Sequence, residues 1–274
     1  MTDLPRIRVD ELFLEARLTS KRHIVVEGAS DDRFFRAWAT EIDGGEHVVV
    51  TSVERIEVPP EALDALGLND GNRARVVVIA CHADQMSVNL RCVADRDCGH
   101  NVDDHEYTTL MWTDYPALES YAVDASVLDR ANLLSFSEKL PPASELLPGL
   151  AFALRELFAV RSQNEHLSKP KYDAGFKHKN RSLTSFDVAA AVDVTIRSAA
   201  AMYPRPEATD DPRTYAYGHD IAELLLASHG NALKNKAGLA GREAVENALR
   251  SALQAVGSYK DEPLFRSLAR WVAA

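Results

Sequence analysis

The sequence has few cysteines, no long apolar run and no excess of positive charge. Cys81, Cys92 and Cys98 are odd in number and show no paired metal spacing, which favours a reduced, cytoplasmic setting. No apolar stretch approaches the roughly 18 residues of a membrane-spanning helix. The first residues also lack the basic start and apolar stretch of a secretory signal. We therefore expect a protein that does not partner a membrane.

Two further absences limit the chemistry. The pattern G-x-x-x-x-G-K-[ST] does not occur, so the chain cannot hydrolyse ATP by that machinery. The formal net charge is -10, which argues against nucleic-acid binding through the bulk charge of the protein. A local cluster of Lys and Arg can still bind phosphates on an acidic protein, so this class of ligand stays open.

The first part of the 274-residue chain alternates predicted strands and helices. Val76–Ile79 would suit a strand, but a parallel sheet needs a crossover before the next strand, so we predict a buried helix there. The expected helices span 7–18, 30–42 and 72–85, with Ser30 as an N-cap, and the expected strands span 23–27, 47–56, 89–95 and 107–112. This pattern predicts an α/β domain over residues 1–125, with a mostly parallel sheet flanked by helices.

Beyond residue 126 strand signals fade and helical patterns dominate. Glycines and prolines separate these patterns. The expected helices span 143–161, 183–202, 219–229, 241–256 and 262–273. We therefore predict a second, α-helical domain over residues 126–274.

Two acidic clusters follow apolar runs of the first domain. Glu27 ends one predicted strand, and Asp31 lies in the first turn of the helix after it. Asp95 and Asp97 end another strand, where residues two apart share a face. If these strands are neighbours, the four carboxylates converge on the edge where open α/β sheets bind ligands. They would repel one another without a cation, and hard oxygen ligands suit Mg²⁺ or Mn²⁺.

The order of these motifs resembles the signature of Toprim domains. The matching stretches are Val25–Gly28 with Asp31, Asp95–Asp97, Glu119-Ser120 and Gly218–Ile221. The string is most similar to a bacterial Toprim-like family formerly of unknown function, which includes the nuclease effector of the PARIS anti-phage systems. OLD-family nucleases also contain Toprim domains. The resemblance covers residues 20–125 well and 215–230 weakly.

The resemblance implies roles for individual residues. Glu27 would be a metal ligand or general acid/base, and Asp95 and Asp97 would be metal ligands. Asp31 and Glu119 would be additional ligands, although a carboxylate in a first helical turn, such as Glu119, is also favoured by the helix dipole alone.

The late motif departs from the family pattern. Relatives tend to carry Lys where this chain has His219, which can stabilise a transition-state charge only when protonated. His219 and the next residue, Asp220, can equally be structural residues that begin a helix.

Residues 166–181 form the most basic stretch, with two aromatic residues among the cations. Phosphates would pair with the cations, and a base would stack on Tyr172 or Phe176. A solvated loop is the alternative. The expected nucleic-acid-binding residues are Lys169, Lys171, Lys177, Lys179 and Arg181.

These observations predict a metal-dependent nuclease that acts on RNA, including tRNA, or on DNA. By resemblance it would be an anti-phage defence effector controlled by a separate partner ATPase, and an oligomer is compatible with the sequence. One alternative is a non-catalytic Toprim-like binding or regulatory subunit, because fold does not guarantee activity. A third is a phosphotransferase or phosphatase for a small nucleotide, which would need a closed pocket instead of an open basic groove.

Overall fold

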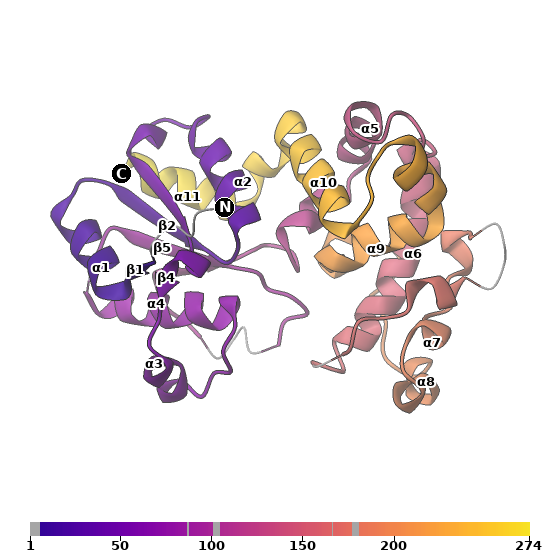
Figure 1. Ribbon diagram of the computed structural model, residues 1–274, viewed down its shortest axis with the longest axis horizontal. Coiled ribbons are helices and arrows are strands. Elements are labelled where there is room, and N and C mark those ends of the chain that lie inside the picture. The colour runs from indigo at the N-terminus through magenta and orange to yellow at the C-terminus, as the bar shows by residue number, and fades with distance from the viewer. Residues whose placement is uncertain (1–5, 87, 101–104, 166, 177–180) are drawn as a thin grey trace. The chain divides into compact units, whose positions relative to one another are not determined.

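The computed structural model describes residues 6–86, 88–100, 105–165, 167–176 and 181–274. Within them the chain forms two compact units (Figure 1). The first contains the described residues up to Asp95, residues 105–114 and Lys260–Ala274, and the second contains Arg96–His100 and Tyr115–Tyr259. The predicted boundary at residue 125 therefore differs from this division, and the last helix returns to the first unit.

The first unit is built on a four-stranded sheet in which every pair of neighbours is parallel. Its order is β3-β2-β5-β6, and a separate parallel pair joins β1 to β4. This confirms the predicted α/β class. The strands are β1 (Ile7–Arg8), β2 (Arg22–Val26), β3 (Val48–Ser52), β4 (Ile56–Glu57), β5 (Leu90–Ala94) and β6 (Leu110–Trp112).

Helices cover both faces of this sheet. α1 and α4 share one buried apolar cluster with the strand residues Leu90 and Cys92. Successive strand residues point to opposite faces, so Arg91 lies on the other side, where its guanidinium stacks 5.1 Å from the Trp271 ring of α11. The helices are α1 (Val9–Leu18), α2 (Ala29–Ala39), α3 (Pro60–Ala65), α4 (Asn72–Met86) and α11 (Pro263–Ala273), with 3₁₀ turns at Gly45–His47 and Val53–Arg55.

An aromatic cluster attaches α11 to α2. The Phe265 ring stacks on Phe35 with ring centroids 5.5 Å apart, and it meets Phe34 and Trp38 edge-on at 6.0 Å. All four side chains are almost fully buried. Such aromatic pairs each contribute about 0.5–1.5 kcal/mol beyond their buried area. The cluster explains why the C-terminal helix belongs to the first unit.

The helix predicted over residues 72–85 is confirmed, because α4 spans Asn72–Met86. Several other boundaries differ from the prediction: the strand expected over 107–112 begins only at Leu110, and the helix expected over 30–42 ends at Ala39. The helix expected over 7–18 begins only at Val9, because Ile7–Arg8 pair with Ile56–Glu57. The strand expected over 47–56 is interrupted, because Ser52 accepts a hydrogen bond from the Glu54 amide and starts a 3₁₀ turn.

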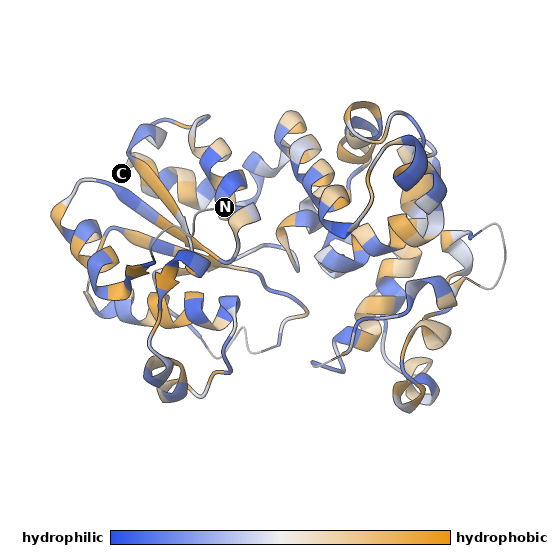
Figure 2. Ribbon diagram, in the orientation of Figure 1, coloured by the Kyte–Doolittle hydropathy of each residue, from blue (hydrophilic) through white to orange (hydrophobic). Residues whose placement is uncertain are grey.

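The second unit is helical, as predicted for this part of the chain. Figure 2 shows that apolar and polar residues alternate along the helices of both units, as expected of helices with one buried side. Its helices are α5 (Ala125–Leu134), α6 (Ala143–Arg161), α7 (Val188–Ala191), α8 (Val194–Ala200), α9 (Gly218–Gly230), a π-helix (Asn231–Lys236) and α10 (Arg242–Val256). Its 3₁₀ turns are Leu118–Ala122, Tyr172–Gly175, Leu183–Ser185 and Pro212–Tyr215, and Ser258–Asp261 follows α10.

One predicted helix of this unit is wrong. Residues 183–202 form a 3₁₀ turn and two short helices instead of one long helix. The Asp187 side chain accepts a hydrogen bond from the Ala190 amide and so begins α7, and Asp193 is the N-cap residue of α8. Aspartate favours helix starts over helix interiors, and this preference outweighs the apolar periodicity. None of the helices described here has the length and apolar character needed to cross a membrane.

Candidate functional site

The carboxyl edge of the sheet in the first unit brings two of the predicted residues together. β2 and β5 are parallel neighbours, paired at Val25 and Cys92, and they end at Val26 and Ala94. Glu27 and Asp95 come directly after these ends. The Asp95 backbone N–H donates a hydrogen bond of 2.8 Å to Glu27 Oε1. The carboxylate of Glu27 is therefore held against the first residue after β5.

The order in which the chain adds strands to the sheet reverses between β2 and β5. From β2 the chain passes through α2 to β3 on one side, and from β3 through α4 to β5 on the other. Glu27 and Asp95 follow the two strands that flank this reversal. Open α/β sheets bind ligands outside the carboxyl ends of such strands. The fold thus places both carboxylates where a ligand site is expected.

Asp31 has a structural role at the same edge. Its Oδ2 accepts a hydrogen bond of 3.0 Å from the Gly28 amide, and Gly28 is the N-cap of α2 in place of the predicted Ser30. A side-chain β-carbon on Gly28 would lie 3.3 Å from this oxygen. Asp31 therefore holds the Glu27-Gly28 turn in position.

Asp97 is placed differently from the prediction. β5 ends at Ala94, so Asp95 and Asp97 do not share a strand face, and Asp97 has a left-handed backbone with φ of 51°. Asp97 belongs to the second unit, where its backbone N–H donates to the Pro116 carbonyl at 2.8 Å. Burial, followed by the Asp97 charge, raises the pKa of Tyr217. The structure therefore associates Asp97 with the segment that leads into α9.

Glu119 meets the start of α9 in the second unit. Its buried carboxylate forms an ion pair with Arg250 of α10. A β-carbon on Gly218 would lie 2.6 Å from Glu119 Oε2, so only glycine fits there without displacement. The neighbouring Ser120 donates to the Ala216 carbonyl at 2.5 Å. The two late motifs of the resemblance thus pack together, and the ion pair gives Glu119 a structural role.

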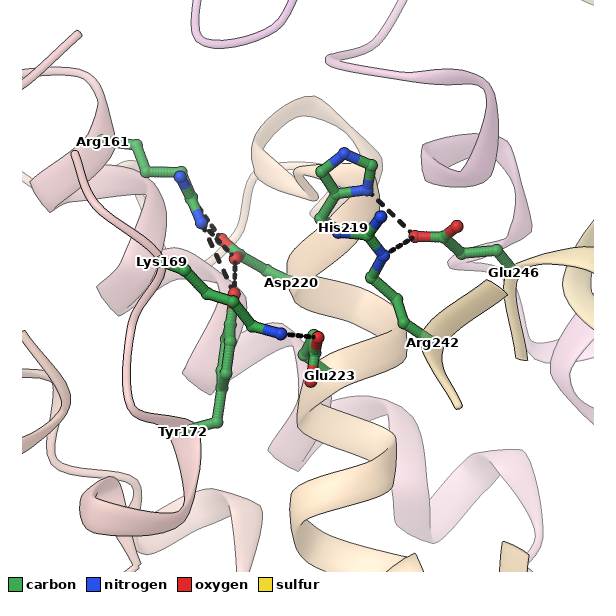
Figure 3. Close-up of polar contacts among 8 residues, drawn as sticks. All are labelled: Arg161, Lys169, Tyr172, His219, Asp220, Glu223, Arg242 and Glu246. Carbon is green, nitrogen blue, oxygen red and sulfur yellow. Dashed lines mark hydrogen bonds and ion pairs between the residues drawn. The ribbon is translucent and has the colours of Figure 1, made fainter. Parts of the chain in front are cut away.

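His219 is the second residue of α9 and is half-exposed, with 49% of its side chain accessible. Its Nδ1 lies 2.9 Å from Glu246 Oε1, and Arg242 Nε approaches the same oxygen at 3.3 Å (Figure 3). Burial acts to raise the pKa of Glu246, but its hydrogen bond to His219 and the nearby arginine charges hold that pKa below its usual value. His219 is therefore a surface residue attached to a buried carboxylate.

The next residue, Asp220, is the centre of a buried polar network (Figure 3). Arg161 donates to both of its carboxylate oxygens, at 2.6 and 2.7 Å, and the Tyr172 hydroxyl donates to Oδ1 at 2.5 Å. The Arg161 guanidinium also lies 4.3 Å from the centre of the Tyr217 ring. Burial acts to lower the pKa of Arg161, but the Asp220 charge and hydrogen bonds outweigh it and raise that pKa.

The predicted stacking of a base on Tyr172 is wrong. Its side chain is buried, and its hydroxyl is bonded to Asp220. Burial and then the Asp220 charge raise the pKa of Tyr172. Phe176 packs edge-on against Phe186, with ring centroids 5.2 Å apart. These aromatic residues attach the basic segment to the helical core.

The described cations of the basic segment differ in their surroundings. Lys169 forms an ion pair with Glu223, and Arg181 pairs with Asp173 and donates to the Ala227 carbonyl, each at 2.6 Å. The Lys171 side chain is exposed. Lys177 and Lys179 lie outside the described residues.

Sequence reasoning missed two arginines. Arg161 and Arg250 hold Asp220 and Glu119, respectively, and each lies on a helix far along the chain from its partner. Nothing in an amphipathic pattern distinguishes an arginine that will face a buried carboxylate from one that will face water. No local signal was available to find either residue.

Among the described residues, no three His, Cys, Asp or Glu side chains form a group that would enclose a metal ion. Neither the models of known protein families nor the curated proteins include a match to this chain.

Proposed function

We propose that this chain is a divalent-metal-dependent nuclease whose essential carboxylates include Glu27 and Asp95. The observation that supports it best is the 2.8 Å hydrogen bond that joins these residues at the ligand-binding edge of a parallel sheet. Phosphodiester hydrolysis needs carboxylates that bind a cation and handle the protons of an attacking water.

The donor chemistry at this edge fits Mg²⁺ or Mn²⁺. Glu27 and Asp95 offer carboxylate oxygens, which hard cations prefer. Mg²⁺ keeps several waters and uses one or two carboxylates together with substrate phosphates, so a closed group of three side chains is not required. Glu27 and Asp95 would hold the ion. Of the other predicted ligands, Asp31 accepts the Gly28 amide, and Asp97 and Glu119 belong to the second unit. When bound, the ion would lower the pKa of a water and offset negative charge on the phosphate.

The residues of the chain have separate tasks in this proposal. Glu27 accepts the Asp95 amide through Oε1, which fixes the position of its carboxylate at the sheet edge, where it would bind the cation or take a proton from the attacking water. Asp31 keeps the following turn in place through Gly28. The predicted role of Glu119 as a ligand is not part of this proposal, because its carboxylate is paired with Arg250 in the second unit. The role of His219 as a cationic partner of the substrate stays a prediction.

The resemblance to Toprim nucleases supports the wider context of the proposal. It points to RNA, including tRNA, or DNA as substrate, and to a role as an anti-phage effector. Because the sequence contains no ATP-binding loop of the common type, control by ATP would require a separate ATPase partner.

One observation favours the non-catalytic alternative, in which the chain is a binding or regulatory subunit. The carboxylates of Glu119 and Asp220 are occupied by arginines, and the described residues form no group of three metal-binding side chains. This alternative predicts nucleic-acid binding without cleavage.

A cleavage assay tests the proposal. Labelled tRNA, single-stranded DNA and duplex DNA are incubated with the protein in Mg²⁺, Mn²⁺ or EDTA. Glu27→Gln keeps an oxygen that can accept the Asp95 amide but removes the charge, so it should fold and should cut at least about 100-fold more slowly. Glu61→Gln, an exposed residue of α3, is the matched control. Absence of metal-dependent cutting in the wild-type protein, or equal rates in both variants, would refute the proposal.

A further inference from the structure

The second unit contains a pocket of about 1060 Å³ that no predicted catalytic residue lines. Its walls come from three parts of the chain: the basic segment, the end of α9 with the π-helix, and the start of α10. π-helical turns often occur at functional sites. The sequence prediction included only the first of these walls.

The charge of the pocket is opposite to that of the whole protein. Five cations and two carboxylates line it, although the chain has a net charge of -10. The cations are Lys169, Lys171, Arg181, Lys234 and Arg242. Such a concentration of positive charge on an acidic protein attracts anions locally.

Two of these cations are available to a ligand. The two carboxylates of the pocket are in ion pairs with Lys169 and Arg181. Lys171 and Lys234 are exposed, and neither has an acidic partner among the residues that the structure describes. They come from different walls, the basic segment and the π-helix. A ligand that contacted both would therefore bridge these walls.

The remaining lining suits phosphate groups better than stacked bases. Asn231 and Asn235 add amide groups, and Asn235 Nδ2 donates to Asn231 Oδ1 at 2.9 Å. The Gly241 end of α10 has no side-chain cap, so its first amides add to the positive potential of the lysines. The ring of Tyr172, the one aromatic residue among the lining residues, is buried and its hydroxyl is bonded to Asp220.

We propose that this pocket binds the sugar-phosphate backbone of a single nucleic-acid strand, with Lys171 and Lys234 as its principal phosphate contacts. The identity of the ligand as nucleic acid rests on the proposed function. The volume matches one or two nucleotides, because pockets of about 300–1,000 Å³ enclose ligands of that size. Recognition through phosphates and not through stacked bases predicts binding that is insensitive to sequence.

Fluorescence anisotropy tests this inference. A labelled 12-nucleotide single strand is titrated with Glu27→Gln protein in EDTA across a range of KCl concentrations. Lys171→Glu/Lys234→Glu should weaken binding about tenfold, and the slope of log Kd against log [KCl] should fall by about 1.4, at about 0.7 for each lost phosphate contact. Arg130→Glu/Lys139→Glu is the charge-matched control, because both residues are exposed in the second unit and neither lines the pocket.

Three results would overturn the inference. The first is no binding to the strand, and the second is an equal loss of affinity in the pocket and control variants. The third is equally tight binding of 5′-AMP or pyrophosphate, which would make the pocket a site for a free anion. Unchanged strand affinity in the pocket variant, together with metal-dependent cleavage by the wild-type protein, would remove the pocket and leave the nuclease proposal intact. Pocket-dependent binding by a protein that never cuts would support the pocket and refute the nuclease proposal.

Discussion

Removal of the Asp220 carboxylate is expected to destabilise the helical unit severely. Asp220→Ala would leave the Arg161 guanidinium in place with only 13% of its side chain exposed and without its two charged hydrogen bonds. Removing one partner of a buried ion pair typically costs about 3–5 kcal/mol, because the remaining charge stays buried and uncompensated. That is a large part of the roughly 5–15 kcal/mol that separates a folded domain from its unfolded chain.

The tryptophans make this prediction easy to localise. Trp38, Trp112 and Trp271 are the three tryptophans of the chain, and all belong to the first unit. Tryptophan fluorescence therefore reports the first unit during urea unfolding, and far-ultraviolet circular dichroism reports the helices of both. We expect Asp220→Ala to lower the free energy of unfolding in the dichroism transition by about 3–5 kcal/mol. The fluorescence transition should move less.

Two controls separate the ion pair from the loss of packing. Tyr172→Phe removes one hydrogen bond to the carboxylate and should cost about 1–3 kcal/mol. Arg161→Met in the Asp220→Ala background removes the stranded charge and should recover part of the lost stability. If Asp220→Ala costs less than about 1 kcal/mol, or Arg161→Met recovers none of the lost stability, the ion pair between Asp220 and Arg161 does not stabilise the helical unit as proposed.

Three further predictions concern single residues. His23 in β2 is buried, neither ring nitrogen has a hydrogen-bond partner among the described atoms, and burial lowers its pKa; the unfolded chain therefore binds the proton more readily. The wild-type protein should thus lose stability as the pH falls through about 6.5, and His23→Leu should lose less. The melting temperature of His23→Leu, relative to that of the wild-type protein, should therefore be higher at pH 5 than at pH 7.5. Gly218→Ala should cost about 1–3 kcal/mol in urea unfolding, because its β-carbon would lie 2.6 Å from Glu119 Oε2; Gly230→Ala, with open space at that position, should not. Phe265→Ala should cost about 3–5 kcal/mol in the fluorescence transition, since it removes the centre of the aromatic cluster that attaches α11.

The sheet could be predicted because its physics is local and periodic. β2 and β5 are short apolar runs, and the need for a crossover between parallel strands identified α4 despite the strand propensity of Val76–Ile79. The same rule predicts that the ends of parallel strands meet at one edge, which is why Glu27 and Asp95 could be paired from the sequence.

Other parts of the fold depend on contacts that no local pattern encodes. The apolar side of α11 is evident from the sequence, but its packing against Phe35 and Trp38 of the first unit is not. The end of β5 at Ala94 moved Asp97 out of the strand, so the alternation argument did not apply to it. The commitment of Glu119 to Arg250 depends on helix packing within the second unit, which strand and helix periodicity does not describe.

Titration of the protein with Mn²⁺, followed by electron paramagnetic resonance of the free ion, tests the metal-binding carboxylates most directly. We predict at least one Mn²⁺ site whose affinity falls about tenfold or more in Glu27→Gln and in Asp95→Asn, while Glu61→Gln binds like the wild-type protein. Equal Mn²⁺ affinity in all four proteins would contradict the claim that Glu27 and Asp95 form a cation site at the sheet edge.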